Sequence, residues 1–125
     1  MLLGAEVIVC STCKFAPDER DGPDGVRGGQ RLYESIHAVA QQPRFAALTI
    51  SSVECLWACA HHCTVHIRSP GKCAYVAGRF DAAGAEAEAI LEFALAYAAS
   101  ADGAVPYRDW PAGVKGHFLV RTPAP

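Results

Sequence analysis

The sequence predicts an α/β fold in which helices flank a four-stranded mixed sheet. Three observations predict it: apolar runs rich in β-branched residues alternate with stretches of helical spacing, a helix joins the first two runs, and a Pro-Gly turn joins the next two. The chain has 125 residues, 51% of them hydrophobic, so it is long enough to bury a core of its own. We therefore expect a single domain over residues 1–125.

The first half of the chain is expected to form a strand, a helix and a second strand. Residues 5–9 are apolar and partly β-branched, which is typical of a buried strand. The Gly- and Asp-rich residues 17–29 predict an exposed loop. Residues 30–41 have apolar positions at helical spacing, and Pro43 ends this helix. Residues 48–53 are again β-branched, so a second strand follows.

The second half is expected to form a hairpin and a helix. Residues 64–68 and 73–77 read as strands, and the Ser-Pro-Gly-Lys sequence at 69–72 suits a tight turn between them. Residues 82–99 predict a second helix, with Asp81 as its N-cap.

The order of these elements predicts a particular topology. Strands joined through a helix run parallel with a right-handed crossover, and the hairpin then adds antiparallel strands to the same sheet. This is the thioredoxin-like arrangement. The tail of the chain is otherwise irregular, although residues 117–121 could add a short strand.

The composition limits which classes of partner and which cellular compartment we expect for this protein. The net charge is −2, whereas proteins that bind nucleic acid are normally basic. The N-terminus has no basic region before its short apolar run, and no stretch approaches the ~18 apolar residues of a membrane helix. We therefore expect a cytoplasmic protein with no nucleic-acid or membrane partner. In that compartment disulfides are rare, so six cysteines point to metal binding or redox chemistry.

Four of the six cysteines fall in two places that the topology brings together. Cys10 and Cys13 follow the first strand, and Cys55 and Cys59 follow the second, which is parallel to it. Parallel strands end at the same edge of a sheet, and open α/β sheets build their sites there. The spacings are C-x2-C and C-x3-C, and four thiolates suit either a [2Fe–2S] cluster or a tetrahedral Zn²⁺.

The remaining cysteines and a histidine pair leave alternatives open. Cys63 is either an accessory metal ligand or a buried structural thiol. Cys73 lies in a predicted strand and is expected in the core. His61 and His62 are either a polar loop tip or imidazole ligands for zinc or a late transition metal.

A dithiol–disulfide oxidoreductase is the rival hypothesis for Cys10 and Cys13. Thioredoxins carry a redox pair after the first strand, but that pair opens a helix whose N-terminus lowers the thiol pKa. Here a Gly- and Asp-rich loop is expected instead, and no proline precedes the third strand to face the pair.

Several motifs together resemble a known family: Val7–Lys14, Val53–Cys59, Cys63–Val65, Pro70–Lys72, Tyr75–Gly78, Ser100–Gly103 and Val105–Pro106. They resemble small bacterial proteins of unknown function that are described as predicted metal-binding. That family is in turn similar to thioredoxin-like [2Fe–2S] ferredoxins.

The resemblance implies a ligand set. Cys10, Cys55 and Cys59 match the pattern of those ferredoxins, and Cys13 takes the remaining role by default, earlier in the loop than their second ligand. Members of the family are, as the resemblance implies, often associated with cobalamin biosynthesis and cobalt handling.

The leading hypothesis is therefore a [2Fe–2S] electron carrier, a binding protein rather than an enzyme. The alternative is a zinc- or cobalt-binding or delivery protein with Cys63 as an added ligand, and the third hypothesis is the dithiol oxidoreductase. The expected partner is a redox or metal-handling protein, with a homodimer also possible. Trp57 and Trp110 could form a docking surface, although core packing is expected for at least one of them.

Overall fold

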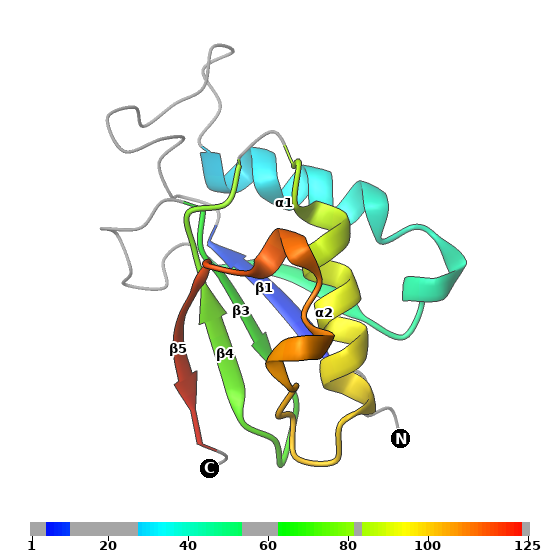
Figure 1. Cartoon of the computed structure of the whole chain (residues 1–125). Coiled ribbons are helices and arrows are strands. Elements are labelled where there is room, and N and C mark those ends of the chain that lie inside the picture. Colours follow the sequence, from blue (N-terminus) through cyan, green and yellow to red (C-terminus); the bar gives the residue numbers. More distant parts are fainter. Residues whose placement is uncertain (1–4, 11–27, 54–62, 82–83, 124–125) are drawn as a thin grey trace.

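A computed structural model describes residues 5–10, 28–53, 63–81 and 84–123 of the chain. These residues form one five-stranded mixed sheet with the order β2-β1-β3-β4-β5 (Figure 1). The four predicted strands are present to within a residue or so at each end, and the stretch near residues 117–121 adds a fifth. The strands are β1 (Glu6–Cys10), β2 (Thr49–Val53), β3 (Val65–Arg68), β4 (Ala74–Ala77) and β5 (Phe118–Thr122).

The pairing of the strands confirms the predicted topology. β1 is parallel to β2 and antiparallel to β3, and β3 and β4 form the expected hairpin. β5 pairs antiparallel with β4, with an irregularity in register between Val76 and Ala77. The sheet is therefore mixed, with β1 at the point where the parallel and antiparallel parts meet.

Two helices and three short 3₁₀ segments complete the described structure. Helix α1 spans Gly28–Val39, two residues ahead of the predicted range at each end. Pro43 does not itself end α1 but begins the first 3₁₀ segment, η1 (Pro43–Phe45). Helix α2 spans Ala87–Ala99. The tail contains η2 (Tyr107–Asp109) and η3 (Ala112–Val114). None of the helices in the described part of the chain is both long and apolar enough to cross a membrane.

The predicted start of the second helix at residue 82, with Asp81 as its N-cap, is wrong. Gly84 has a φ of +92°, a left-handed conformation that no α-helix contains, so α2 begins only at Ala87. Instead, the backbone carbonyl of Asp81 accepts the Gly84 N–H at 2.9 Å. The Asp81 N–H donates to the Glu86 carboxylate at 2.8 Å, which closes the turn ahead of the helix.

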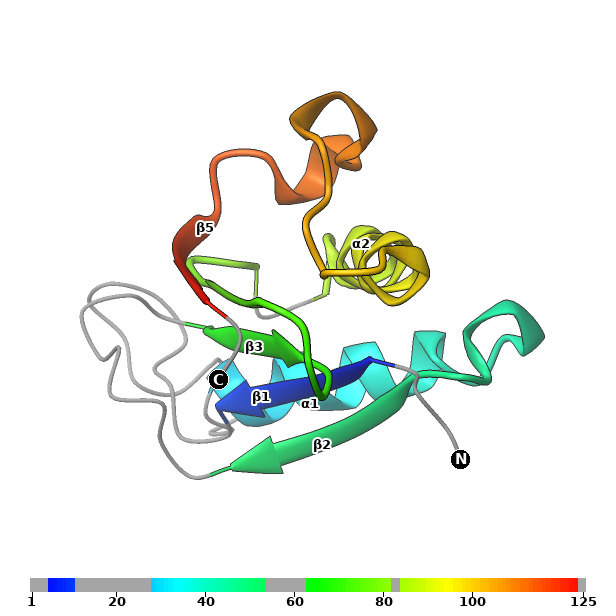
Figure 2. The ribbon, with the colours of Figure 1, turned by 90° about the horizontal axis from the view of Figure 1, so that it is seen from below.

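The main core lies between one face of the sheet and the two helices. Alternate residues of the strands face it, among them Val7, Val9 and Val65, all with 0% exposure. The apolar positions at helical spacing meet them from α1 and α2, which also pack against each other (Figures 1 and 2). The helix residues in this core include Leu32, Ile36, Ile90, Phe93, Ala94 and Tyr97.

An aromatic cluster attaches the fifth strand to this core. The Phe118 ring of β5 lies 4.8 Å from that of Phe93 in α2 and 4.7 Å from that of Trp110, centroid to centroid. The indole N–H of Trp110 donates to the Val105 carbonyl at 2.9 Å. Trp110 is therefore partly buried and packs against the core, as expected for at least one tryptophan. Trp57 lies outside the described residues.

The opposite face of the sheet, which we call the outer face, points away from α1 and α2. It carries the other alternate residues of the strands, including Glu6, His66 and Arg68, all at least partly exposed. The outer face is polar in the row that contains Glu6 and Arg68, whereas the next row places His66 between Ile8 and Val76.

Candidate metal centre

The first and second strands end side by side, as predicted. Cys10, the last residue of β1, is paired in register with Val53, the last residue of β2. Cys10 is 3% exposed, and its backbone N–H donates to the Thr64 carbonyl at 3.1 Å. The candidate ligand Cys10 is thus held by strands on both sides at the edge where the two parallel strands end.

Cys63 lies at the same edge, immediately before β3. It is fully buried, and its φ of 52° places its backbone in the left-handed region. Burial raises the pKa of the Cys63 thiol to about 12, with smaller contributions from Asp81, Cys10 and Glu86. In the metal-free chain Cys63 is therefore protonated at neutral pH, and it lies close enough to Cys10 for the two sulfur groups to interact.

The other predicted ligands lie outside the described residues. These are Cys13, Cys55 and Cys59, together with the histidine pair His61 and His62. Within the described ranges there is no group of three or more His, Cys, Asp or Glu side chains that could hold a metal ion. Of the sequence-predicted set, the structure brings together Cys10 and Cys63.

The donor chemistry at this edge fits a thiophilic centre. Cys10 supplies a buried sulfur, and Cys55 follows the paired residue Val53 by two positions. Sulfur donors of this kind suit an iron–sulfur cluster or zinc.

Cys73 and Lys72 lie at the opposite edge of the sheet. Cys73 is partly buried against the core, as expected, and its backbone carbonyl accepts the Tyr97 hydroxyl at 2.6 Å. The Lys72 ammonium donates to the Ala98 carbonyl at 2.7 Å and so caps the C-terminus of α2. Lys72 therefore serves the helix and lies away from Cys10.

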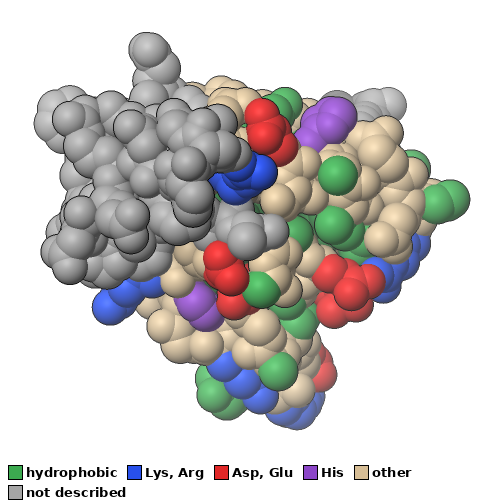
Figure 3. Space-filling model, turned by 90° about the horizontal axis from the view of Figure 1, so that it is seen from above, with side chains coloured by type: hydrophobic (Ala, Val, Ile, Leu, Met, Phe, Trp, Pro, Cys, Tyr) green, Lys and Arg blue, Asp and Glu red, His purple; other side chains and the backbone are tan. Residues whose placement is uncertain are grey.

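On the side of the molecule where β1 ends, the described surface is mixed in charge (Figure 3). Figure 3 looks on this side of the molecule, and acidic and basic side chains are interspersed over its described part. No single basic patch forms among the side chains described there.

A second polar region lies on the outer face of the sheet. Neither Glu6 nor His66 belongs to a sequence motif that indicates a site. The sheet places them with Arg68 on the outer face, where all three line a groove. The signal that could have found them is the alternation of polar and apolar residues in His66-Ile67-Arg68, but their alignment with Glu6 depends on strand register.

The strand order, the mixed pairing and the two helices define a protein of thioredoxin-like fold. Among solved structures, a thioredoxin-like [2Fe–2S] ferredoxin from Aquifex aeolicus is similar, with a TM-score of 0.57 and 18% sequence identity. The match covers 95% of this chain and 93% of that one. At this identity the likeness establishes the fold.

The chain belongs to the DUF1636 family, a family of proteins of unknown function, whose model matches residues 7–124. No curated protein matches the sequence.

Proposed function

We propose that this protein holds a metal centre through the thiolates of Cys10, Cys13, Cys55 and Cys59, and that the centre is a [2Fe–2S] cluster used for one-electron transfer. The observation that carries the proposal is the register pairing of Cys10 with Val53. It starts the two cysteine-bearing segments at neighbouring points on one sheet edge. The similar fold of a [2Fe–2S] ferredoxin over 95% of the chain supports the same choice of centre.

The role of the described residues in such a centre follows from their placement. A bound [2Fe–2S] cluster supplies a one-electron couple. Cys10 would donate a sulfur ligand from the end of β1, and its burial would limit the access of water to that sulfur. Solvent access and hydrogen bonds to the ligand sulfurs are the means by which a protein sets the potential of such a group.

The test is to purify the protein anaerobically and measure iron, acid-labile sulfide and visible absorption. We expect iron and sulfide in equal amounts, as a [2Fe–2S] cluster requires, and a charge-transfer spectrum. Cys10→Ser should lose most of both, whereas Cys73→Ser, a matched change at the opposite edge, should keep them. A colourless protein that contains zinc and no sulfide would overturn the cluster and leave the metal site standing.

The alternative centre is zinc or cobalt, in a protein that binds or delivers the ion. The proximity of Cys63 to Cys10 supports this alternative, because it puts a second thiol among the described residues at the edge where β1 ends. Titration of the metal-free protein with Zn²⁺ and Co²⁺ would measure it, with thiolate-to-cobalt absorption as the readout. Under this alternative Cys63→Ser weakens metal binding, and equal affinities of wild type and variant would remove Cys63 from the site.

A further inference from the structure

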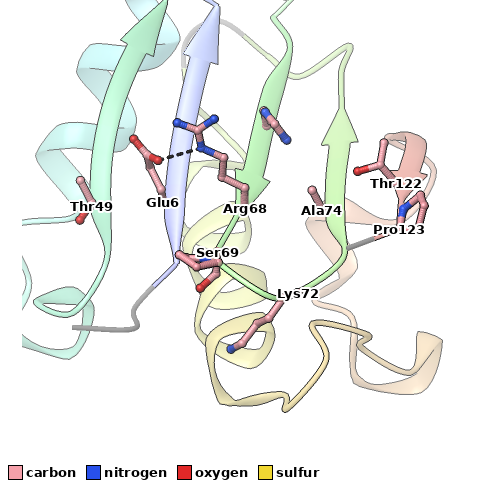
Figure 4. Close-up of a pocket in the computed structure, with 10 residues that line it drawn as sticks. Glu6, Thr49, Arg68, Ser69, Lys72, Ala74, Thr122 and Pro123 are labelled. Carbon is pink, nitrogen blue, oxygen red and sulfur yellow. Dashed lines mark hydrogen bonds and ion pairs between the residues drawn. The ribbon is translucent and has the colours of Figure 1, made fainter. Parts of the chain in front are cut away.

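A groove of about 750 Å³ lies on the outer face, at the edge where β1 begins. Its floor is one row of residues that crosses the sheet, because strand register aligns them (Figure 4). Glu6 is four residues from Cys10 along β1, so the groove floor lies about 13 Å from the candidate metal ligand. The row comprises Thr49, Glu6, Arg68, Ala74 and Thr122.

Arg68 is the side chain that defines the chemistry of this groove. Its Nε donates to Oε1 of Glu6 at 2.9 Å, and the Ser51 hydroxyl donates to Oε2 of the same carboxylate at 3.1 Å. Glu6 thus holds the Arg68 guanidinium through its Nε atom. The two terminal nitrogens of Arg68 have no hydrogen-bond partner among the described residues, and its side chain is 55% exposed.

The groove around Arg68 has room for a ligand. Ala74 follows Arg68 in the row, and its small side chain lies between Arg68 and Thr122 (Figure 4). Lys72 also lines the groove, but its ammonium donates to the Ala98 carbonyl at the end of α2, so the positive charge offered to a ligand is that of Arg68. Burial lowers the pKa of His66, which also lines the groove, so its imidazole is neutral at pH 7 and can both donate and accept a hydrogen bond.

From this arrangement we propose that the groove binds a small molecule bearing a carboxylate or phosphate, with the two terminal nitrogens of Arg68 as its main contact. A planar guanidinium matches both anions through paired hydrogen bonds, and one already oriented by a carboxylate loses less freedom when it binds. The volume lies in the range of ligand sites. Figure 4 shows the guanidinium over β1, on the Glu6 side of the Arg68 backbone, so the ligand reaches its terminal nitrogens above β1.

The test is an amide NMR titration of the full-length, isotope-labelled protein with inorganic phosphate and, separately, with succinate. We expect saturable shifts confined to the row around Arg68, and the tighter of the two probes identifies the anion class. Arg68→Gln should abolish the shifts, and Arg68→Lys should weaken binding about tenfold, since the paired geometry is lost. Arg108→Gln, which removes an exposed arginine outside the groove, serves as the control.

Two results would overturn the proposal. One is the absence of saturable shifts with both probes. The other is an equal loss of binding in Arg68→Gln and Arg108→Gln, which would reveal general attraction of anions rather than a site. The readout does not depend on bound metal, so this proposal and the proposed function can fail separately.

Discussion

At the scale of single residues, two residues adopt a left-handed backbone conformation that L-amino acids usually avoid. Among the described non-glycine residues, Cys63 and Arg79 have positive φ angles, 52° and 63°. Cys63 precedes β3 and Arg79 follows β4, and these two strand ends are neighbours in the sheet. The strain thus gathers at the edge where Cys10 lies, as is common near functional sites.

Arg79→Gly tests this strain at an exposed position, where the substitution removes no core packing. Arg79 is exposed, and the left-handed conformation costs it about 1 kcal/mol that glycine avoids. We expect the variant to be as stable as wild type or more stable, by up to about 1 kcal/mol in urea unfolding. Arg108→Gly, at an exposed position in η2, should instead be destabilised, and equal losses in both variants would contradict the strain.

The Glu6–Arg68 pair predicts a pH dependence of stability. The hydrogen bond from Arg68, above all, lowers the pKa of Glu6 below its usual 4.5, so the ionised form favours folding. This stabilisation is fully present above the unfolded pKa near 4.5 and is lost as pH falls through the lower folded value. Because the pair is partly exposed, it contributes under about 1 kcal/mol.

Urea unfolding between pH 7 and pH 3 measures this contribution. Glu6→Gln should lose stability at pH 7 and show a weaker decline in acid than wild type. Arg68→Gln should flatten the same part of the curve, and the double variant should add little further change. A Glu6→Gln curve parallel to that of wild type would show that the pair does not control this dependence.

At the scale of elements, the start of α2 is decided by a contact with α1. A Cβ placed on Gly84 would lie 2.5 Å from the Cβ of Ser35, and the φ of Gly84 is +92°. Only glycine therefore fits at position 84, where the chain passes α1. Alanine-rich residues from 85 onward favour helix by themselves, but the helix cannot extend back through Gly84.

Gly84→Ala should therefore be markedly destabilising. Gly71 has a similar φ of +76°, but a Cβ added there would meet nothing within 4 Å, so Gly71→Ala measures backbone strain alone. We expect Gly84→Ala to cost about 1–3 kcal/mol more than Gly71→Ala in urea unfolding, because overpacking adds to strain. Equal costs would mean that α1 shifts freely to accept the methyl group.

The elements also bear on the rival hypotheses for the cysteines. A thioredoxin-type redox pair opens a helix, whereas here Cys10 is the last residue of β1, and the described α1 covers Gly28–Val39. Residues 11–27 lie outside the described ranges, so this comparison concerns the ends of β1 and α1. Insulin reduction would measure dithiol activity, which the metal-centre proposal expects to be absent.

At the scale of the whole molecule, a bound metal centre should stabilise the fold. A group that binds the folded chain and not the unfolded one raises its stability, and thiolate ligands from two strands would couple metal binding to the sheet. We expect removal of the metal to lower the thermal midpoint by about 10 °C. Cys73→Ser should retain this difference and Cys10→Ser should lose it, whereas a metal-independent midpoint would contradict the proposed centre.

Much of the fold could be predicted from the sequence because its signals are local. Hydrophobic periodicity located both helices and four strands, and the turn at 69–72 predicted the hairpin. The fifth strand was less visible, since its formation depends on Phe118 packing against Phe93, far away in the sequence. The early start predicted for α2 failed for the same reason, because the contact of Gly84 with Ser35 is not local.

The candidate site likewise has some features that the sequence predicts and others that depend on the tertiary structure. By itself, the sequence determined which residues could bind a metal, because cysteine chemistry and spacing are properties of the chain alone. It also predicted that the first two strands end at one edge, since the crossover rule makes them parallel. Only the tertiary structure decided that Cys63 is buried beside Cys10, and that Glu6, Arg68 and Ala74 share a row on the outer face. Both depend on strand register, which is set when side chains pack and a whole sheet chooses which face to bury.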